Sequence, residues 1–165
     1  MTSTARPLVG RRTGVVAALV ISLLVFATDQ GVKRFVEGTM RIGESLPAVP
    51  GILNFTYIEN DGGAFGVLGG SQAVLLIGSA VAVGVVLWML FSGEPSKLTS
   101  AACGLVLGGA AGNLLDRISA GEVTDYLDLQ FWPLQSWPIF NAADIAITTG
   151  VGLLLLSALR NPERG

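Results

Sequence analysis

Four long apolar stretches constrain this chain more than any other feature of its sequence. They cover residues 13–32, 71–92, 98–116 and 137–159, and the only charged residues in them are Asp29, Asp116 and Asp144. A helix needs about 20 apolar residues to cross the hydrocarbon core of a bilayer, and all four stretches come near that length. The sequence therefore predicts one mainly α-helical membrane domain over residues 1–165, with four transmembrane helices.

The segments outside these stretches differ from one another. Residues 1–12 are polar and basic and have little reason to fold. Residues 34–70 are expected to form a small β-rich lobe outside the membrane, because residues 51–59 alternate and are rich in β-branched and aromatic side chains. Residues 127–140 contain two tryptophans and two phenylalanines, which are typical of the headgroup level of a membrane. This segment predicts a short interfacial helix or lid.

The order of the stretches also predicts a common location for the polar residues at their ends. Four spans place both termini on one side, and Arg6, Arg11 and Arg12 favour the cytoplasm for that side. The ends of the spans that lie on the opposite, extracytoplasmic side carry Asp29, Gln30, Lys33, Asn60, Asn113, Asp116, Arg117, Asn141 and Asp144. Loops and helix caps alone would scatter polar residues over both sides. The convergence therefore predicts a functional site near the extracytoplasmic surface.

The absence of histidine limits the chemistry of such a site. A chain without histidine has no Ser-His-Asp or Cys-His system and no zinc site built on imidazole. Proton transfer must then come from Asp, Glu, Lys, Tyr or water. Two partly desolvated carboxyl groups a few ångströms apart share a proton, as in aspartic proteases. We interpret two of the aspartates as a proteolytic pair that needs neither a metal nor an organic cofactor.

Four aspartates compete for this role, and each has a structural alternative. Asp144 is expected about six residues into the fourth span, where the alternative is a capping aspartate. Asp125 lies in an apolar context, where desolvation would raise its pKa. Asp128 is the alternative partner, although it resembles a solvated loop charge. Asp116 is expected to form a structural ion pair with Arg117 at the end of the third span.

Two further interpretations stay open at this point. Asp29 and Lys33 form an i, i+4 pair, for which structural anchoring is the better interpretation. Intramembrane carboxylates also mark ion pathways, so a small transporter or proton relay is a rival to a protease, and a membrane scaffold is a third possibility. Against a relay, the charges gather at one end of the spans. The net charge of −2 argues against a nucleic-acid partner.

Five short motifs occur in one order along the chain, and together they carry a resemblance. They are Asp29-Gln30-x-x-Lys33, Asn60-x-Gly62-x-Ala64-Phe65, Gly112-Asn113-x-x-Asp116-Arg117, Val123-x-Asp125-Tyr126 and Phe140-Asn141-x-Ala143-Asp144. Placed on four predicted spans, they resemble the lipoprotein signal peptidases, the type II signal peptidases of bacteria. The resemblance covers nearly the whole chain. The chain departs from the family pattern at Asp61, Gly63, Thr124 and Tyr126.

The resemblance implies a four-span aspartyl endopeptidase of the bacterial inner membrane. Such enzymes remove the signal peptide of prolipoproteins just before a cysteine that carries diacylglycerol. By resemblance, Asp125 and Asp144 form the catalytic dyad, and Asn60 and Arg117 line the substrate site. The residues expected to support the site are Asp29, Lys33, Gly62, Asn113, Asp116 and Asn141. The expected partners are lipid-modified prolipoproteins and membrane lipids, and we expect a monomer.

Overall fold

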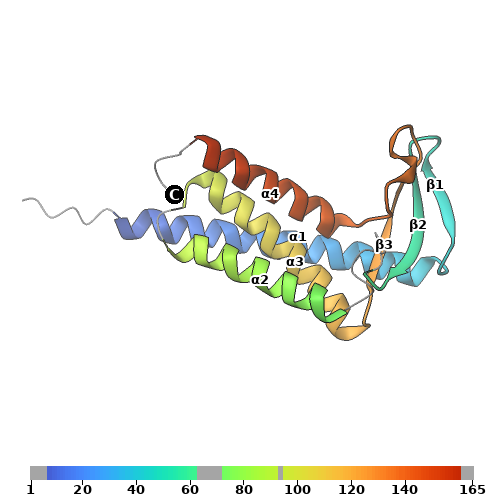
Figure 1. Ribbon diagram of the computed structural model, residues 1–165, viewed down its shortest axis with the longest axis horizontal. Coiled ribbons are helices and arrows are strands. Elements are labelled where there is room, and N and C mark those ends of the chain that lie inside the picture. Colours follow the sequence, from blue (N-terminus) through green and yellow to red (C-terminus); the bar gives the residue numbers. More distant parts are fainter. Residues whose placement is uncertain (1–6, 63–71, 93–94, 161–165) are drawn as a thin grey trace, which may run out of the picture.

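A bundle of long helices carries a small sheet at one end (Figure 1). The structure is a computed structural model and describes residues 7–62, 72–92 and 95–160. Its helices are α1 (Pro7–Thr39), α2 (Gln72–Phe91), α3 (Lys97–Ser119), α4 (Ala142–Arg160) and the short 3₁₀ helix η1 (Leu134–Ser136). Its strands are β1 (Ser45–Val49), β2 (Leu53–Asn60) and β3 (Val123–Leu129). In Figure 1, α1 begins and α4 ends at the end of the bundle away from the sheet.

The helices confirm the predicted fold class. Within the described ranges, three are long and apolar enough to cross a membrane, at Arg12–Thr39, Lys97–Ser119 and Ala142–Leu159. The apolar helix Leu76–Phe91 is shorter, and it belongs to α2, which occupies the second predicted span. The predicted β-rich lobe is present as a three-stranded antiparallel sheet. The protein is thus a mainly helical membrane protein with a small sheet.

The first helix is longer than predicted at both ends. It begins at Pro7, inside the segment that was expected not to fold, and proline suits the first turn of a helix because its missing N–H has no partner there. It continues past Val32 to Thr39, because Asp29 and Lys33 neutralise each other at 2.9 Å on one helix face. Val36 then packs against the sheet. The lobe therefore begins after Thr39 rather than at residue 34.

The connection between α3 and α4 differs more from the prediction. Val123–Leu129 forms the third strand of the sheet, so the lobe is built from two connections rather than one. The predicted interfacial helix is the three-residue η1. Residues 137–141 are not helical, because Phe140 exchanges backbone hydrogen bonds with Leu127 at 2.8 and 3.1 Å. The fourth helix consequently begins at Ala142, and Asp144 lies in its first turn.

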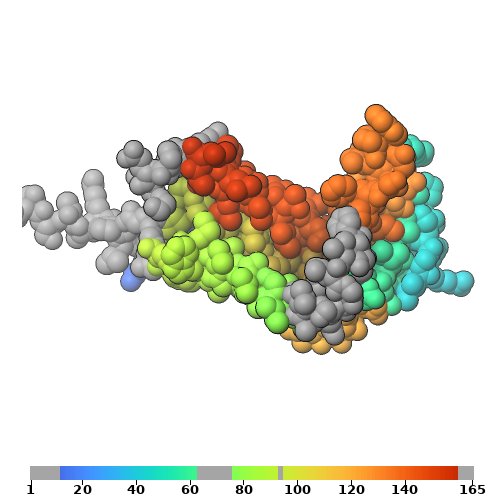
Figure 2. Space-filling view, viewed as in Figure 1, coloured from blue at the N-terminus to red at the C-terminus, as the bar shows by residue number. Residues whose placement is uncertain are grey.

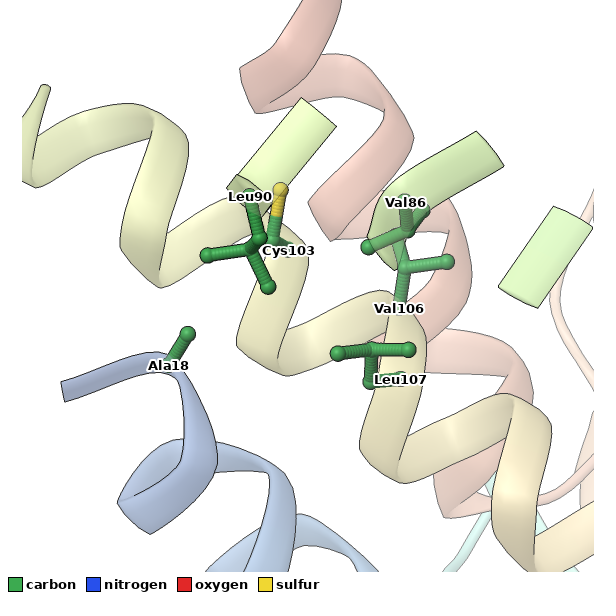
Figure 3. Close-up of a cluster of buried hydrophobic side chains, with 6 residues drawn as sticks. All are labelled: Ala18, Val86, Leu90, Cys103, Val106 and Leu107. Carbon is green, nitrogen blue, oxygen red and sulfur yellow. The ribbon is translucent and has the colours of Figure 1, made fainter. Parts of the chain in front are cut away.

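Helix α3 is the centre of the bundle. Most of its spanning segment is buried, whereas those of α1 and α4 are largely exposed, as expected for helices facing lipid. Glycines on α3 permit close packing: a methyl group added at Gly104 would lie 2.6 Å from the carbonyl oxygen of Ala18 in α1. A cluster of side chains from α1, α2 and α3 fills the remaining space (Figure 3). The cluster includes Cys103, which is buried among these apolar side chains.

The sheet has one apolar face that leads to Asp125. In the order β1-β2-β3, cross-strand partners lie on the same face. Side chains alternate between faces along each strand, except at the register shifts between Pro47 and Val49 and between Phe55 and Ile58. The register therefore places on this one face Leu46, Val49, Leu53, Phe55, Ile58, Asn60, Val123, Asp125, Leu127 and Leu129.

The segment joining β3 to α4, coloured orange, projects to one side of the bundle beyond α4 (Figure 2).

Candidate active site

The start of α4 is the structural centre of the candidate site. Asn141 precedes the helix, and its side-chain oxygen accepts the backbone N–H of Asp144 at 3.0 Å. In return, the Asp144 carboxylate accepts the backbone N–H of Asn141 at 3.2 Å. This reciprocal arrangement is a capping box. The expected structural alternative for Asp144 is therefore real, and the cap also fixes the direction of its carboxylate.

Two other elements complete the cap. The backbone N–H of Ala142 bonds to the hydroxyl oxygen of Tyr126 in β3 at 3.2 Å. The backbone N–H of Ala143 bonds to the carboxylate of Asp29 in α1 at 3.0 Å. The first N–H groups of a helix have no partner within it, so these contacts tie α4 to α1 and to the sheet. The position of Asp144 is thereby determined by three separate elements.

Asp125 is held in β3 by two asparagines. The Asn141 amide donates to its Oδ1 at 2.6 Å, and the Asn60 amide donates to its Oδ2 at 2.7 Å. The side chain is only 2% exposed. The pKa of Asp125 is raised to about 6, mainly by burial and in part by the charge of Asp144, while the hydrogen bonds from Asn60 and Asn141 oppose the increase. A carboxyl group in this environment retains its proton at higher pH than usual.

Asn113 of α3 connects the second carboxylate to the helix bundle. Its amide nitrogen donates to Oδ1 of Asp144 at 2.9 Å. Its amide oxygen accepts from Nζ of Lys33 at 2.9 Å and from the Asn141 amide at 3.1 Å. Because an ammonium group can only donate, Lys33 fixes which end of the Asn113 amide faces Asp144. The site thus has one self-consistent pattern of donors and acceptors.

Lys33 lies at the base of this network and is 1% exposed. Besides Asn113, its ammonium group contacts the Asp29 carboxylate at 2.9 Å and the Asp116 carboxylate at 2.6 Å. Gln30 adds a hydrogen bond to Asp116 at 2.8 Å. Asp116 therefore forms an ion pair with α1, whereas the sequence predicted a structural pair with Arg117. Asp29 and Lys33 form the ion pair that their i, i+4 spacing predicts.

The remaining candidate residues lie around this core. The backbone N–H of Gly62 bonds to Oδ1 of Asn60 at 2.9 Å, and Gly62 has a φ of 98°, which favours glycine. Arg117 donates to the backbone oxygen of Asn113 at 3.3 Å. Asp128 accepts from Thr56 at 2.8 Å and takes no part in the network described above. Ala64 and Phe65 lie outside the described residues.

Two contacts near Asp125 were missed in the sequence. They are the Tyr126 hydroxyl bond to α4 and a hydrogen bond of 2.8 Å from Thr124 to Glu37 of α1. The sequence offered one signal for these contacts. Thr124 and Tyr126 each carry a hydroxyl group in an otherwise apolar strand segment, so each hydroxyl needs a hydrogen-bond partner. Over the described part of the chain, no group of three or more Cys, Asp or Glu side chains is arranged to hold a metal ion.

Fold and site together define a polytopic membrane protein in which two aspartates at one end of the bundle are each hydrogen-bonded to the same asparagine, Asn141. The family model of signal peptidase (SPase) II matches residues 21–160. The chain is 42% identical over 150 residues to the lipoprotein signal peptidase of Syntrophotalea carbinolica, covering 88% of this chain and 92% of that one. It is 40% identical over 155 residues to that of Lactobacillus gasseri, covering 93% and 99%.

Solved structures agree with this result. A bacterial membrane enzyme determined by the in meso method at 2.3 Å has a TM-score of 0.80 and 29% identity, with 90% of this chain and 91% of that chain covered. A second, at 1.9 Å, has a TM-score of 0.79 and 30% identity, with 89% and 95% covered. The chain belongs to the signal peptidase II family. It is therefore a peptidase and a multi-pass bacterial membrane protein.

Proposed function

We propose that this protein is an aspartyl endopeptidase that removes the signal peptide from diacylglyceryl-modified prolipoproteins, just before the lipidated cysteine. Relatives that are named lipoprotein signal peptidases support the substrate class. The proposed catalytic residues are Asp125 and Asp144. Asn60 and Arg117 are proposed to line the substrate site, and the other members of the network hold the dyad.

One observation carries the choice of the pair. Asn141 donates from its side chain to Asp125 at 2.6 Å and from its backbone to Asp144 at 3.2 Å. A single residue therefore binds both carboxylates and fixes one relative to the other. Asp116 is instead paired with Lys33, which occupies the carboxylate that would otherwise be the rival partner.

The proposed reaction adds water across the scissile peptide bond. In the reactive form Asp125 carries the shared proton, which its raised pKa of about 6 favours, and it donates a hydrogen bond to the scissile carbonyl oxygen. Asp144 accepts a proton from water as the oxygen of that water attacks the carbonyl carbon. When the carbon–nitrogen bond breaks, the proton that Asp144 took from water passes to the nitrogen of the leaving amine, and the hydroxyl group from water stays on the carbonyl carbon. The two carboxyl groups return to their starting state.

The apolar face of the sheet is a proposed binding surface for an extended, apolar segment of the substrate. Leu46 is 47% exposed and Phe55 is 37% exposed on this face, and the register continues to Asp125 and Asn60. Such a face buries apolar side chains of a peptide. We propose that the segment around the cleaved bond lies along it, while the diacylglyceryl chains remain in the lipid.

The orientation in the membrane is proposed on the basis of charge. Arg6, Arg11 and Arg12 near the start of the chain favour cytoplasmic termini. The dyad, at the other end of the bundle, would then lie near the extracytoplasmic surface, with the protein acting as a monomer. Reporter fusions at Lys97 test this orientation. A reporter at Lys97 should lie in the cytoplasm, and an extracytoplasmic signal there would show that the opposite orientation is correct.

The test of function is cleavage of a purified diacylglyceryl-modified prolipoprotein in detergent, with the cleaved bond located by mass spectrometry. Asp125→Asn and Asp144→Asn should each slow single-turnover cleavage by about 10²–10⁴-fold, because each removes a proton-transfer group. Asparagine at position 144 can still accept one of the two hydrogen bonds that the carboxylate accepts, and thermal unfolding checks that each variant is folded. Because the pair acts as a unit, the double variant should be hardly slower than either single one.

Two controls accompany this experiment. Activity should persist in EDTA, and restoration of lost activity by a divalent ion would favour metal-assisted hydrolysis instead. Asp116→Asn should reduce activity only partly, through weaker anchoring of Lys33. If Asp125→Asn cleaves normally while a folded Asp116→Asn variant is inactive, the wrong partner has been assigned to Asp144.

A further inference from the structure

The hydroxyl group of Tyr126 joins the strand of one proposed catalytic carboxyl to the helix of the other. Tyr126 follows Asp125 directly in β3 and is 2% exposed. Its oxygen accepts the backbone N–H of Ala142 at 3.2 Å. Ala142 is the first residue of α4 and lies two residues before Asp144. One side chain thus spans the distance between the two carboxyl-bearing elements.

The tyrosine ring has little freedom to move. It packs in a buried cluster with Val36 of α1 and Tyr57 of β2, and the centroid of the Phe55 ring lies 6.2 Å from its own. A ring fixed on several sides places its hydroxyl oxygen at a defined point, since tyrosine has few rotatable bonds. The contact with Ala142 also satisfies one of the N–H groups that a helix start leaves without a partner.

We propose that Tyr126 is a positioning residue for the reaction: its hydroxyl oxygen accepts the Ala142 N–H and so holds Asp144 at its working distance from Asp125. The proposal rests on the proposed function. Tyr126 acts through the start of α4, with no contact to the reacting atoms. Its loss should therefore slow the chemical step and leave substrate binding unchanged.

Tyr126→Phe removes this oxygen and keeps the ring, and Tyr57→Phe is the matched control. Tyr57 belongs to the same buried cluster, but its hydroxyl donates to Glu59 of its own strand at 3.1 Å. Single-turnover cleavage should slow about fivefold in Tyr126→Phe, the factor expected for one lost hydrogen bond. KM should stay unchanged in both variants, and Tyr57→Phe should cleave like the wild type.

Ala142→Pro removes the same hydrogen bond from its other end. Proline is favoured at the first position of a helix and has no N–H, so this variant carries the test even if Tyr126→Phe does not fold. In the Ala142→Pro background, Tyr126→Phe should cause no further slowing. Amide exchange at Ala142, measured by NMR, should be faster in Tyr126→Phe than in Tyr57→Phe.

Two outcomes overturn the proposal. One is equal cleavage by Tyr126→Phe and Tyr57→Phe, and the other is full slowing by Tyr126→Phe in the Ala142→Pro background. A wild-type protein that cleaves no prolipoprotein overturns the proposed function, and the positioning role with it. Amide exchange at Ala142 distinguishes the two failures, because it reports the contact whether or not the protein is active.

Discussion

The body of the bundle and its sheet end are held together by different forces, although α3 runs through both. In the body, α3 packs on α1 through glycine, and a methyl group at Gly108 would lie 2.6 Å from the carbonyl oxygen of Ser22. At the sheet end, Asn113 on the same helix instead bonds to Lys33, which is 1% exposed. Close approach of backbones stabilises helices in lipid, whereas a buried ammonium group is stable only when paired.

This difference predicts opposite tolerances to mutation. The body has little room for added atoms at the glycines where α3 packs on α1, and its buried core cluster is apolar. The sheet end depends on its polar contacts, because a buried donor or acceptor without a partner costs about 1–3 kcal/mol. Such an arrangement is costly for stability alone. It is consistent with a region that is retained for chemistry.

Lys33→Met is expected to produce the largest loss of stability. It leaves the carboxylates of Asp29 and Asp116 without their shared cation, and removal of one partner from a buried ion pair costs about 3–5 kcal/mol. The measurement is thermal unfolding in detergent. Arg34→Met is the control, because Arg34 is 74% exposed and lies 3.9 Å from Glu37. Equal losses in the two variants would mean that burial of the ion pair does not matter.

Asp125→Asn is expected to slow cleavage severely and to remove a pH dependence from the stability of the protein. Burial raises the pKa of Asp125 to about 6 from an ordinary 3.8. A carboxyl group with a raised folded pKa contributes stability at low pH, and that contribution is lost as pH rises through about 6.

The stability of Asp125→Asn relative to the wild type should therefore rise between pH 4 and pH 7, on top of a pH-independent cost, because asparagine can accept only one of the two hydrogen bonds that Asp125 accepts. The increase is up to about 3 kcal/mol, from 1.36 kcal/mol for each pH unit between the two pKa values. Thermal unfolding of both proteins at the two pH values measures it. A difference that is independent of pH would contradict the burial of a titrating carboxyl group.

The same contrast explains how much of the fold the sequence could predict. The ends of α3 are marked by Lys97 and Arg117, and its bounds follow closely from the apolar pattern. The end of α1 was placed too early, because Asp29 and Lys33 look like the polar end of a span. Their charges cancel only through a contact on the helix surface, which the apolar pattern does not show.

The candidate site was predictable as a location and less so in detail. Alternating spans were enough to gather Lys33, Asn113 and Asp144 at one end. The depth of Asp144 was wrong, because Phe140, directly before Asn141, pairs with Leu127 of β3 and does not continue the helix. The Tyr126 hydroxyl contact depends on how β3 docks on α4, and no local pattern records that docking.

Gly108→Ala tests the body of the bundle and should have a smaller effect. The added methyl group would also lie 2.7 Å from Cβ of Val25, so α1 and α3 must separate. Overpacking of this kind costs about 1–3 kcal/mol. Gly84→Ala on α2 is the matched control, since no atom lies within 4 Å of its added methyl group. Cleavage per folded molecule should be unchanged in both variants. A loss of cleavage in Gly108→Ala alone would mean that the packing of the body also determines the geometry of the site.

Asp128→Asn is expected to have the smallest effect, although Asp128 lies only three residues from Asp125 on the same strand. The register places the two side chains on opposite faces of the sheet, and Asp128 accepts a hydrogen bond from Thr56 that asparagine can also accept. A surface change that keeps its hydrogen bond alters stability by about 0.5 kcal/mol or less. Single-turnover cleavage should stay within about twofold of the wild type, since a change of that size corresponds to such a factor. If Asp128→Asn instead abolished cleavage in a folded protein, Asp128 would replace Asp125 as the partner of Asp144, and the polar face of the sheet would be the reactive one.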